Sequence, residues 1–592
     1  GAVVFQQQHC VLAHARLSII DLSEGANQPM QFSNLAIVFN GEVYNFREIR
    51  KELVALGHRF ELDSDTEVIL HAYSEWGVKC VDRFIGMFAF AVLDKERNEL
   101  VIVRDRAGVK PLYYYVEGNT FMFASELKAF YPHPAFRRKI SKKALGLYFK
   151  YGYVPAPYAI FENTHKLRQG HYLIYHLDTH TYDSHQYWNV MDFYHRPTLD
   201  ISYDEAKVEL ERILESAFNY RMVADVPVGV FLSGGYDSTA LTAILQKDRT
   251  EKLKTFTIGF PTGNNEAPIA REIARRLGTD HTEAMCSEAE CKKIIPTLPF
   301  FYDEPFADNS AVPTILVSQL ARKKVTVALS ADSGDETFAG YNRYAGLAGI
   351  MKYLHAMRHL GGKRLADVVE AMCKTVNPYS ILHEKGETLA KLLRTVPEYR
   401  AAVATEGGSY GVLAESVYKR LLRQDYPAPL FLLDERLFND TISVATAMDY
   451  INYMADDILV KVDRAAMSVS LEGREPLIDH RIIEFAAQLP LEFKMKDGVK
   501  KRILRDIVYK YVPRELMDRP KTGFMMPVDG WLRTDLRYLL DDNINESELD
   551  DSLFDVHSVM AIKNLYLNDR LKHENKVIWR LLMFQMWKKE NM

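Results

Sequence analysis

The chain has 592 residues, of which 47% are hydrophobic and 26% charged, and its formal net charge at pH 7 is −5. These values are ordinary for a globular protein, the length suggests several domains, and the charge gives no reason to expect a nucleic-acid or membrane partner. No stretch of about 18 apolar residues occurs. The five scattered cysteines form no CxxC pair, so we expect a cytoplasmic protein without disulfides.

The first part of the chain, residues 1–188, alternates short apolar strands with helices. Strands are expected at 35–39, 88–93, 100–103, 112–115 and 121–124. A helix at 64–73 begins with Ser64 and Asp65, residue types that cap helices. Strand clusters separated by helices indicate a layered α+β domain.

The periodicity changes twice in the rest of the chain. It fails at 189–203, which contains Pro197, so this stretch is expected to be a linker. From residue 204 onward, helical patterns alternate with buried strands at 228–232, 255–260 and 325–329, which predicts a doubly wound parallel sheet. After about residue 345 the pattern is almost wholly helical.

A glycine-containing turn, residues 233–238 (Ser-Gly-Gly-Tyr-Asp-Ser), joins the first of these strands to a helix. Such a turn aims backbone N–H groups and the positive end of the helix dipole at one point, which makes an anion site. Ser233 and Ser238 add hydroxyl donors, and Asp237 could hold Mg²⁺. The turn lacks the Gly-Lys-[Ser/Thr] ending of the usual nucleotide P-loop and resembles the pyrophosphate loop of ATP pyrophosphatases.

Three acidic residues, Asp332, Asp335 and Glu336, follow the strand at 325–329. They could hold a cation and a proton, because an open α/β sheet binds ligands where its strands end. A polar helix cap with solvated carboxylates would give the same pattern.

With these segments in place, the chain resembles the glutamine-hydrolysing asparagine synthetases, a family that includes β-lactam synthetase. The resemblance rests on 13–21, 39–45 and 64–67 in the first part, and on 233–238, 302–305, 328–341, 456–464, 476–481, 501–505 and 519–524 in the second. It covers essentially the whole chain. It implies an N-terminal-nucleophile glutaminase domain with α/β/β/α layers at 1–188, and an α/β doubly wound ATP-pyrophosphatase domain with a helical C-terminal part at 204–592.

The resemblance implies that the first domain releases ammonia from glutamine. The family uses an N-terminal cysteine as nucleophile and its α-amine as base. Here the Asn40 side chain and the Gly41 N–H, at the end of a strand, match the oxyanion hole. Arg16 matches the group that pairs with the glutamine carboxylate, and Asp65 with Glu42 matches the group that holds its ammonium. The implied glutamine-binding positions are Arg16, Ile19, Ile20, Asn40, Glu42 and Asp65.

The start of the chain departs from the family pattern. Residue 1 is Gly rather than Cys, and the opening Cys-Gly-Ile and Arg-Gly-Pro-Asp segments of the family are not among these residues. Cys10 is no substitute, because it lies in a strand-like run without a free amine and is expected to pack in the core. We expect the complete polypeptide to carry the cysteine segment before Gly1.

For the second domain, the resemblance implies that an acceptor carboxylate attacks ATP, giving an acyl-adenylate and pyrophosphate, and that ammonia then displaces AMP. Asp237 and Asp335 would hold Mg²⁺. Lys501 matches a lysine that stabilises charge in both steps. Without the resemblance, the local sequence would indicate only an exposed helical lysine. Asp332 matches an acid/base position. The implied ATP-binding positions are Leu232, Ser233, Gly234, Gly235, Asp237, Ser238, Ile258, Ser330 and Ala331.

Ammonia must also cross between the domains, which the family achieves through an internal tunnel. Residues 104–111 are a candidate part of that interface. The expected partners are the small molecules glutamine, ATP and an acceptor carboxylate, without nucleic acid or membrane, and a homodimer is a candidate assembly.

The acceptor stays open. Asparagine-forming members usually read Ser-Gly-[Asp/Glu]-Gly-x-Asp-Glu and then Phe-Gly-Gly-Tyr, whereas this chain has Ala331, Ser333 and Ala339 at glycine positions. Gly473 and Glu475 lie in a segment where Val is common in the family. Added side chains reshape a crowded loop. Aspartate is the first hypothesis, and a sugar uronic acid of a surface-polysaccharide pathway is the second.

A third hypothesis belongs to another class of protein, a binding or scaffold protein without glutaminase activity. The intact 233–238 turn, Asp335 and Lys501 argue against it.

Overall fold

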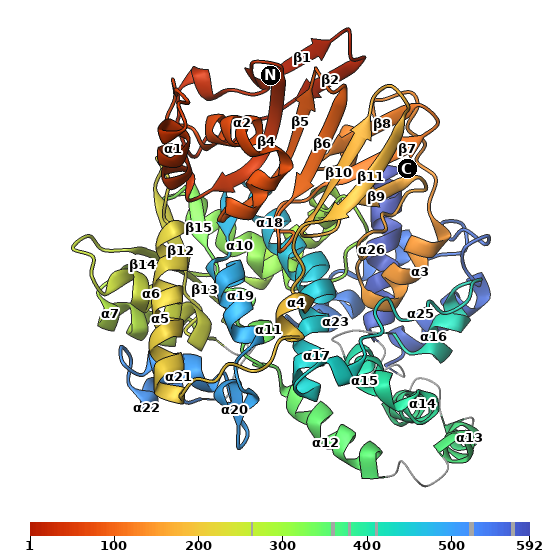
Figure 1. Ribbon diagram of the computed structural model, residues 1–592. Coiled ribbons are helices and arrows are strands. Elements are labelled where there is room, and N and C mark those ends of the chain that lie inside the picture. Colours follow the sequence, from red (N-terminus) through yellow and green to blue (C-terminus); the bar gives the residue numbers. More distant parts are fainter. Residues whose placement is uncertain are drawn as a thin grey trace.

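The computed structural model describes residues 1–261, 265–356, 362–373, 375–376, 381–408, 413–519, 526–569 and 575–592. Antiparallel sheets of the N-terminal part lie at one end, above a parallel sheet and a large set of helices (Figure 1). Residues 520–524 of the motif at 519–524 lie outside the described residues. Within the described part, no helix is long and apolar enough to cross a membrane.

A six-stranded antiparallel sheet, ordered β11-β10-β6-β5-β4-β3, forms the centre of the N-terminal part. Its strands are β3 (Met30–Phe32), β4 (Leu35–Val43), β5 (Gly86–Asp94), β6 (Glu99–Arg104), β10 (His171–His176) and β11 (Thr181–Gln186). Alternate residues of β4 face opposite sides. Ile37 and Phe39 pack in one core with α1 (Phe46–Ala55) and α2 (Asp65–Trp76), whereas Ala36 and Val38 pack in another.

That second core lies between the large sheet and a smaller one, ordered β8-β7-β9, with β7 (Tyr113–Glu117), β8 (Thr120–Ala124) and β9 (Thr164–Lys166). Tyr114 of β7 faces this core. Tyr113 and Tyr115 face the other way, toward α3 (Lys142–Tyr151) and the C-terminal α26 (Asn575–Asn591). The predicted α/β/β/α layering is therefore confirmed, and α26 of the C-terminal part contributes to its outer layer. The hairpin of β1 (Ala2–Phe5) and β2 (Cys10–Ala13) completes this end.

Residues 189–203 form a packed connection. They contain α4 (Met191–Tyr194), in which Met191 and Tyr194 are buried. The next helix, α5 (Tyr203–Tyr220), begins at a capping box made by Ser202 and Glu205.

The C-terminal part is built on a parallel sheet ordered β14-β13-β12-β15-β16. Its strands are β12 (Val228–Phe231), β13 (Lys254–Gly259), β14 (Asp280–Met285), β15 (Val327–Leu329) and β16 (Glu472–Arg474). The core containing Val327 and Leu329 includes residues of α5 and α6 (Tyr236–Gln246), while the core containing Ala328 includes residues of α10 (Ala311–Arg322) and α18 (Leu459–Met467). Helices on both faces confirm the predicted doubly wound architecture.

The chain order of the strands reverses between β12 and β15. From β12 the chain proceeds through β13 to β14 at one edge, and β15 then returns to the free side of β12. Such a reversal leaves a crevice at the carboxyl ends of the two strands. The turns at 233–238 and 330–336 both follow these ends.

Two strands of the parallel sheet, β14 and β16, were not predicted. The sequence of β14 has no apolar run, and its residues are half-buried or exposed at the sheet edge. β16 has the sequence Glu-Gly-Arg and lies in a stretch expected to be helical. Its pairing with β15, which aligns Leu329 with Arg474, holds it in the sheet.

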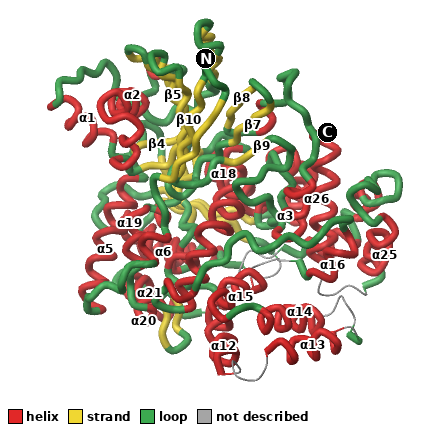
Figure 2. The backbone as a smooth tube through the Cα atoms, turned by 45° about the vertical axis from the view of Figure 1, so that its right-hand side comes forward, coloured by secondary structure: helices red, strands yellow, loops and turns green. Residues whose placement is uncertain are grey.

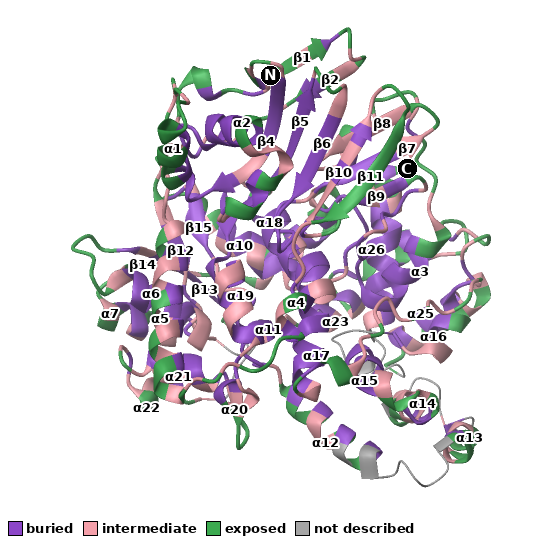
Figure 3. Ribbon diagram, viewed as in Figure 1, coloured by how far each residue is buried: buried purple, intermediate pink, exposed green. Residues whose placement is uncertain are grey.

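Helices make up most of the remaining C-terminal part. They include α12 (Asn342–Ala356), α13 (Gly362–Cys373), α14 (Ile381–Arg394), α15 (Arg400–Gly408), α17 (Thr441–Met448), α19 (His480–Ala487), α21 (Arg502–Val508) and α25 (Val556–Leu567). Residues Asp449–Ile458, between α17 and α18, form a π-helix. Helices α12 to α15 gather at the end opposite the antiparallel sheets (Figure 2). The central strands are buried, whereas β11 is exposed along its whole length (Figure 3).

Candidate active sites

A cavity of about 670 Å³ lies at the carboxyl ends of β12 and β15. The cavity walls include every residue that the sequence placed in the ATP or metal site, and both synthetase residues expected to be catalytic. These are Leu232, Ser233, Gly234, Gly235, Asp237, Ser238, Ile258, Ser330, Ala331, Asp332, Asp335 and Lys501.

The turn at 233–238 is closed by its own hydroxyl groups. The Ser233 N–H donates to Ser238 Oγ (3.2 Å), and the two serine hydroxyls lie 3.1 Å apart. Gly234 has φ +79°, a left-handed conformation that favours glycine. α6 begins directly after Gly235 without a side-chain cap, so its first N–H groups can bind an anion in the cavity.

Lys501 joins the two acidic loops. Its Nζ lies 2.5 Å from Asp237 Oδ2 and 2.8 Å from Asp335 Oδ1. Burial lowers the pKa of Lys501, but the two carboxylates outweigh that effect and keep the pKa above the ordinary value of lysine. Lys501 is therefore a buried cation and not an exposed helical lysine. Side chains at Gly334 and Gly340 would overlap this cluster, Gly334 at Asp237 and Gly340 at Asp335 and Lys501.

Two departures from the family's glycines carry backbone strain. Ser333 has φ +81° and Ala339 has φ +54°, so both non-glycine residues adopt the left-handed conformation. That conformation costs about 1–2 kcal/mol per residue outside glycine. The loop thus keeps a backbone shape suited to glycine although the side chains have changed.

Asp332 lies on the cavity wall, where Ser330 Oγ donates to its Oδ2 at 2.5 Å. Lys461, in an ion pair with Asp308 (3.3 Å), lines the same cavity. Sequence reasoning gave Lys461 and Asp308 no role, although Lys461 lies in a segment, 456–464, that carried the family resemblance.

Glu336, one of the three acids that the sequence placed after β15, also lines the cavity. The Tyr341 hydroxyl donates to Glu336 Oε1 at 2.6 Å, and both residues line the cavity. Burial, and then the charge of Asp335, raise the pKa of Glu336 to about 7. Arg519 also lines the cavity and donates to the carbonyl of Gly234 (3.1 Å).

The oxyanion-hole candidates Asn40 and Gly41 lie inside β4, which continues to Val43, so the expectation that the strand ends there was wrong. Asn40 Nδ2 donates to Ser125 Oγ at 3.2 Å. Gly41 has φ +133°, and a Cβ there would overlap the Met87 carbonyl oxygen. The position therefore requires glycine.

The other glutamine-site candidates lie around the same strand. Asp65 is buried and its Oδ2 accepts from the Val43 N–H (3.0 Å), which brings it to the end of β4. The Arg16 guanidinium donates to the carbonyls of Ile20 (2.9 Å) and Asp21 (2.5 Å), in a loop where Ile19 and Ile20 are buried. The Asp63 N–H donates to Asp21 Oδ2 (3.2 Å), which ties that loop to the start of α2.

Glu42 faces the C-terminal part of the chain. Its Oε1 lies 3.8 Å from the guanidinium of Arg474, which also pairs with Glu472 (2.7 Å). Burial, and then the charges of Glu472 and Asp65, raise the pKa of Glu42 well above its ordinary value. The structure thus places Glu42 at the interface of the two parts as well as beside Asp65.

Comparison with known proteins divides the chain in the same way, into a glutaminase part and a synthetase part. Residues 209–589 match the family described as Asparagine synthase, and residues 1–188 match the Glutamine amidotransferase domain. The chain is 31% identical to Asparagine synthetase [glutamine-hydrolyzing] 1 of Bacillus subtilis (strain 168), an alignment that covers 98% of this chain and 90% of that protein.

Asparagine synthetase [glutamine-hydrolyzing] 3 of the same organism is 31% identical over 90% of this chain and 84% of its own length. Amidase chry2 of Gibberella zeae is 27% identical over 88% of this chain and 82% of its own length.

The layered N-terminal part and the doubly wound C-terminal part define a glutamine amidotransferase joined to a synthase, an enzyme of the carbon–nitrogen ligase class. Within that class, the chain belongs to the asparagine synthase family.

Proposed function

We propose that the protein is an ATP-dependent, amide-forming ligase. Residues 1–188 belong to the domain that releases ammonia from glutamine, residues 189–203 are a linker, and residues 204–592 convert an acceptor carboxylate into a carboxamide. The observation that carries the proposal is the convergence of Asp237, Asp335 and Lys501 beside the anion-binding turn at the switch point of the sheet. Acceptor and ATP would give an acyl-adenylate and pyrophosphate, and ammonia would then displace AMP. All five cysteines are free, which supports a reducing, cytoplasmic location.

The residues present fit a magnesium ion. The carboxylates of Asp237 and Asp335 converge on one position, which Lys501 Nζ occupies. Carboxylate oxygens are hard ligands, and Mg²⁺ that binds together with substrate phosphates typically takes one or two protein carboxylates. Gly334 leaves the space that Asp237 uses. Asp237 and Asp335 would hold the ion, which when bound neutralises phosphate charge.

The other polar groups have separate roles in this proposal. The N–H groups at the start of α6 bind phosphate oxygens, and Lys501 stabilises the negative charge that develops at the α-phosphate. Asp332, fixed by Ser330 at 2.5 Å, is placed to accept the proton that ammonia loses on attacking the acyl-adenylate. In the first domain, Asn40 and Gly41 stabilise the oxyanion of glutamine hydrolysis.

We propose aspartate as the acceptor. Aspartate carries an α-ammonium and an α-carboxylate besides the carboxylate to be activated, so its site needs charges of both signs. Lys461 and Glu336 supply one of each on the wall of the cavity. A uronic acid offers hydroxyl groups around its carboxylate and carries no ammonium group that could pair with Glu336.

The test is pyrophosphate release with saturating ammonium and Mg-ATP, comparing aspartate with a panel of uronic acids and their nucleotide conjugates. We expect release with aspartate and background release with the uronates. Strong release with a uronate and none with aspartate would show that the acceptor is a uronic acid, and the proposed mechanism would stay the same. The absence of release with any acceptor would favour the scaffold hypothesis.

A further inference from the structure

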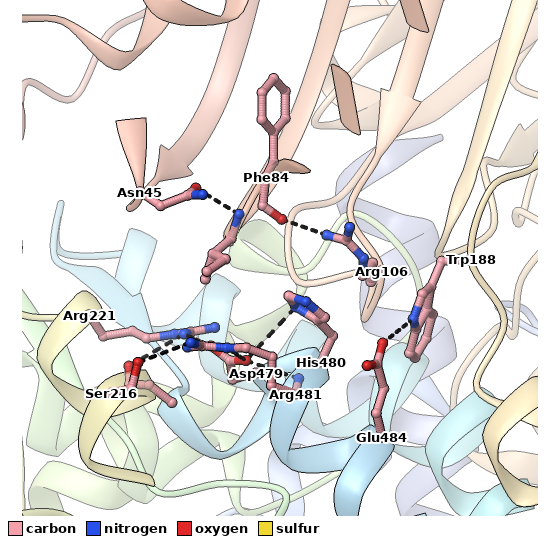
Figure 4. A network of polar contacts seen from close by, with 12 residues as sticks. Asn45, Phe84, Arg106, Trp188, Ser216, Arg221, Asp479, His480, Arg481 and Glu484 are labelled. Carbon is pink, nitrogen blue, oxygen red and sulfur yellow. Dashed lines mark hydrogen bonds and ion pairs between the residues drawn. The ribbon is translucent and has the colours of Figure 1, made fainter. Parts of the chain in front are cut away.

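Pairs of arginine and aspartate lie both in the interior of the molecule and on the wall of the ATP cavity. In the interior, Arg221 and Arg481 bind Asp479, which ties the end of α5 to the start of α19 (Figure 4). Asp479 is 1% exposed and does not line the cavity, so its contacts hold the fold together. The pair of Arg505 and Asp518 is different, because Arg505 lines the cavity.

Arg505 lies one helical turn after Lys501. The N–H of Arg505 donates to the carbonyl of Lys501 (2.9 Å), and the N–H of Tyr509 donates to the carbonyl of Arg505 (2.9 Å). Residues four apart lie on the same face of a helix. Arg505 is therefore a neighbour of the buried cation of the site, and both residues line the cavity.

The guanidinium of Arg505 is held at the phosphate-binding turn. Its central carbon lies 4.6 Å from the ring centre of Tyr236, the residue at which α6 begins. A cation over an aromatic ring is attracted by the electrons of the ring. Nε of Arg505 donates to the Tyr509 hydroxyl (3.2 Å), and Nη2 pairs with Asp518. These contacts hold the arginine beside the start of α6, where the proposed mechanism places phosphate oxygens.

Asp518 binds the polar groups that surround this guanidinium. Its Oδ1 accepts from the hydroxyls of Tyr236 and Tyr509, the second at 2.5 Å, and from Arg505. Burial acts to raise the pKa of Asp518, but these hydrogen bonds outweigh it and lower the pKa below its ordinary value. Asp518 therefore stays ionised at neutral pH and fixes one edge of the guanidinium.

The other edge of the guanidinium can bind a ligand. Nη1 of Arg505 makes no hydrogen bond to any of the described residues. The side chain is 23% exposed and lines the cavity, so a molecule in the cavity can reach it. A guanidinium has a fork of N–H groups whose geometry matches the oxygens of a phosphate group.

We propose that Arg505 binds the β- and γ-phosphates of ATP and holds them as pyrophosphate leaves, with Tyr236 and Asp518 as positioning residues for its guanidinium. This inference rests on the proposed function. When the acceptor carboxylate attacks the α-phosphorus, the bond to the bridging oxygen breaks, and its electron pair stays with pyrophosphate. The leaving group thus gains negative charge, which a fixed cation stabilises. Lys501 serves the α-phosphate in that mechanism, and Arg505 supplies a second cation one turn further along the same helix.

The test compares pyrophosphate with AMP, because only pyrophosphate contains the phosphates that Arg505 would bind. Isothermal titration calorimetry measures the Kd of each for the full-length polypeptide in the presence of Mg²⁺. Arg505→Met removes the guanidinium and should raise the Kd for pyrophosphate about tenfold or more, the effect of one lost hydrogen bond between charged groups. Its Kd for AMP should stay within about twofold of the wild-type value.

Three further variants separate binding from folding. Tyr236→Phe keeps the ring beside the guanidinium but removes the hydroxyl that donates to Asp518, so it should raise the Kd for pyrophosphate by a smaller factor, about threefold. Arg505→Lys keeps the charge without the fork and should fall between wild type and Arg505→Met, which it replaces if that variant does not fold. Arg514→Met is the matched control, because Arg514 lies over the ring of Tyr509 (4.5 Å) but does not line the cavity. It should change neither Kd.

A Kd for pyrophosphate within about twofold of wild type in both Arg505 variants would overturn the assignment and leave the proposed function intact. Equal losses of affinity for pyrophosphate and AMP would also overturn it, because Arg505 would then act only through the fold. A wild-type protein that binds neither pyrophosphate nor ATP would contradict both the inference and the proposed function.

Discussion

Lys501 contacts both Asp237 and Asp335, and this shared contact accounts for two carboxylates lying together in a largely buried site. Without the cation, the two charges would repel each other and one carboxylate would gain a proton. The same ion pairs offset this repulsion and hold both side chains in position for a cation that arrives with ATP. Each of the three residues therefore depends on the other two.

Replacing Asp237 or Asp335 by Asn should lower acceptor-dependent pyrophosphate release by about 10²–10³-fold or more, because each change removes charge at the phosphate site. Glutamine hydrolysis should persist, since it occurs in the other part of the chain. Asp204→Asn, a change at an exposed residue, is the control and should alter neither rate. Near-normal pyrophosphate release at saturating Mg²⁺ would exclude the substituted residue as a ligand.

Asn40→Ala should slow glutamine hydrolysis by about 10²–10³-fold, the usual loss for one oxyanion donor. Ammonia-dependent amide synthesis should survive the change. Glutamate release and pyrophosphate release, measured in parallel with each nitrogen source, check the result. An equal loss of both activities would contradict the assignment of two separate sites.

We propose that Asp65 pairs with the ammonium of glutamine, and this role predicts that glutamine binding depends on pH. Burial raises the pKa of Asp65 to about 6, so the carboxylate needed to pair with the glutamine ammonium is lost as the pH falls below that value. KM for glutamine should therefore rise, by up to about tenfold per pH unit below pH 6. Asp65→Asn should have a raised KM that no longer changes with pH.

Asp65 affects the stability of the fold in the opposite direction: a rise in pH favours glutamine binding but lowers the free energy of unfolding. The pKa of Asp65 is higher in the folded protein than in the unfolded chain. Its favourable contribution to the free energy of unfolding is therefore complete below the pKa of the unfolded chain, and it is lost as the pH rises through about 6. Asp65→Asn should thus unfold at a higher temperature than wild type above pH 6 but not near pH 4. A KM that stays constant in wild type from about pH 5 to pH 8 would contradict the role of Asp65 in binding.

At the scale of elements, the loop between β15 and α12 sets the geometry of the synthetase site through close backbone approach. A Cβ at Gly340 would overlap Asp335 and Lys501, so Gly340→Ala should displace both and reduce pyrophosphate release by about 10²-fold. Gly346→Ala is the control, because Gly346 is exposed in α12 with open space around it. That change should raise stability by up to about 1 kcal/mol and leave activity unchanged.

Unimpaired pyrophosphate release in Gly340→Ala would mean that the loop tolerates a shift of Asp335 and Lys501. The rate would then not depend on the observed arrangement. Thermal unfolding of both glycine variants separates a local displacement from a general loss of folding.

The sequence was sufficient for elements with a strong local pattern. The apolar runs before residues 233 and 330 predicted β12 and β15, and the glycine turn predicted the anion site between them. β16 could not be predicted, because a three-residue Glu-Gly-Arg strand has no periodicity and depends on pairing with β15. The contact between Lys501 and Asp237 could not be predicted either, because the two residues lie 264 positions apart along the chain and no local sequence pattern indicates that they meet.

At the scale of the whole molecule, the two parts are joined by buried charges rather than by an apolar surface alone. Glu42 and Lys110 of the first part face Arg474 and Asp463 of the second, at 3.8 and 3.3 Å. Such pairs cost desolvation energy but allow few relative orientations of the two parts. A fixed orientation is what ammonia transfer between two distant sites would require.

The central claim is that one nitrogen passes from glutamine to the acceptor for each ATP cleaved. The most direct measurement supplies the full-length polypeptide with amide-¹⁵N-glutamine, Mg-ATP and aspartate, and quantifies glutamate, AMP, pyrophosphate and labelled amide together. We expect equal amounts of AMP, pyrophosphate and ¹⁵N-amide, with glutamate formed at least in the same amount. Glutamate release without AMP or labelled amide, or AMP release without any amide, would contradict it.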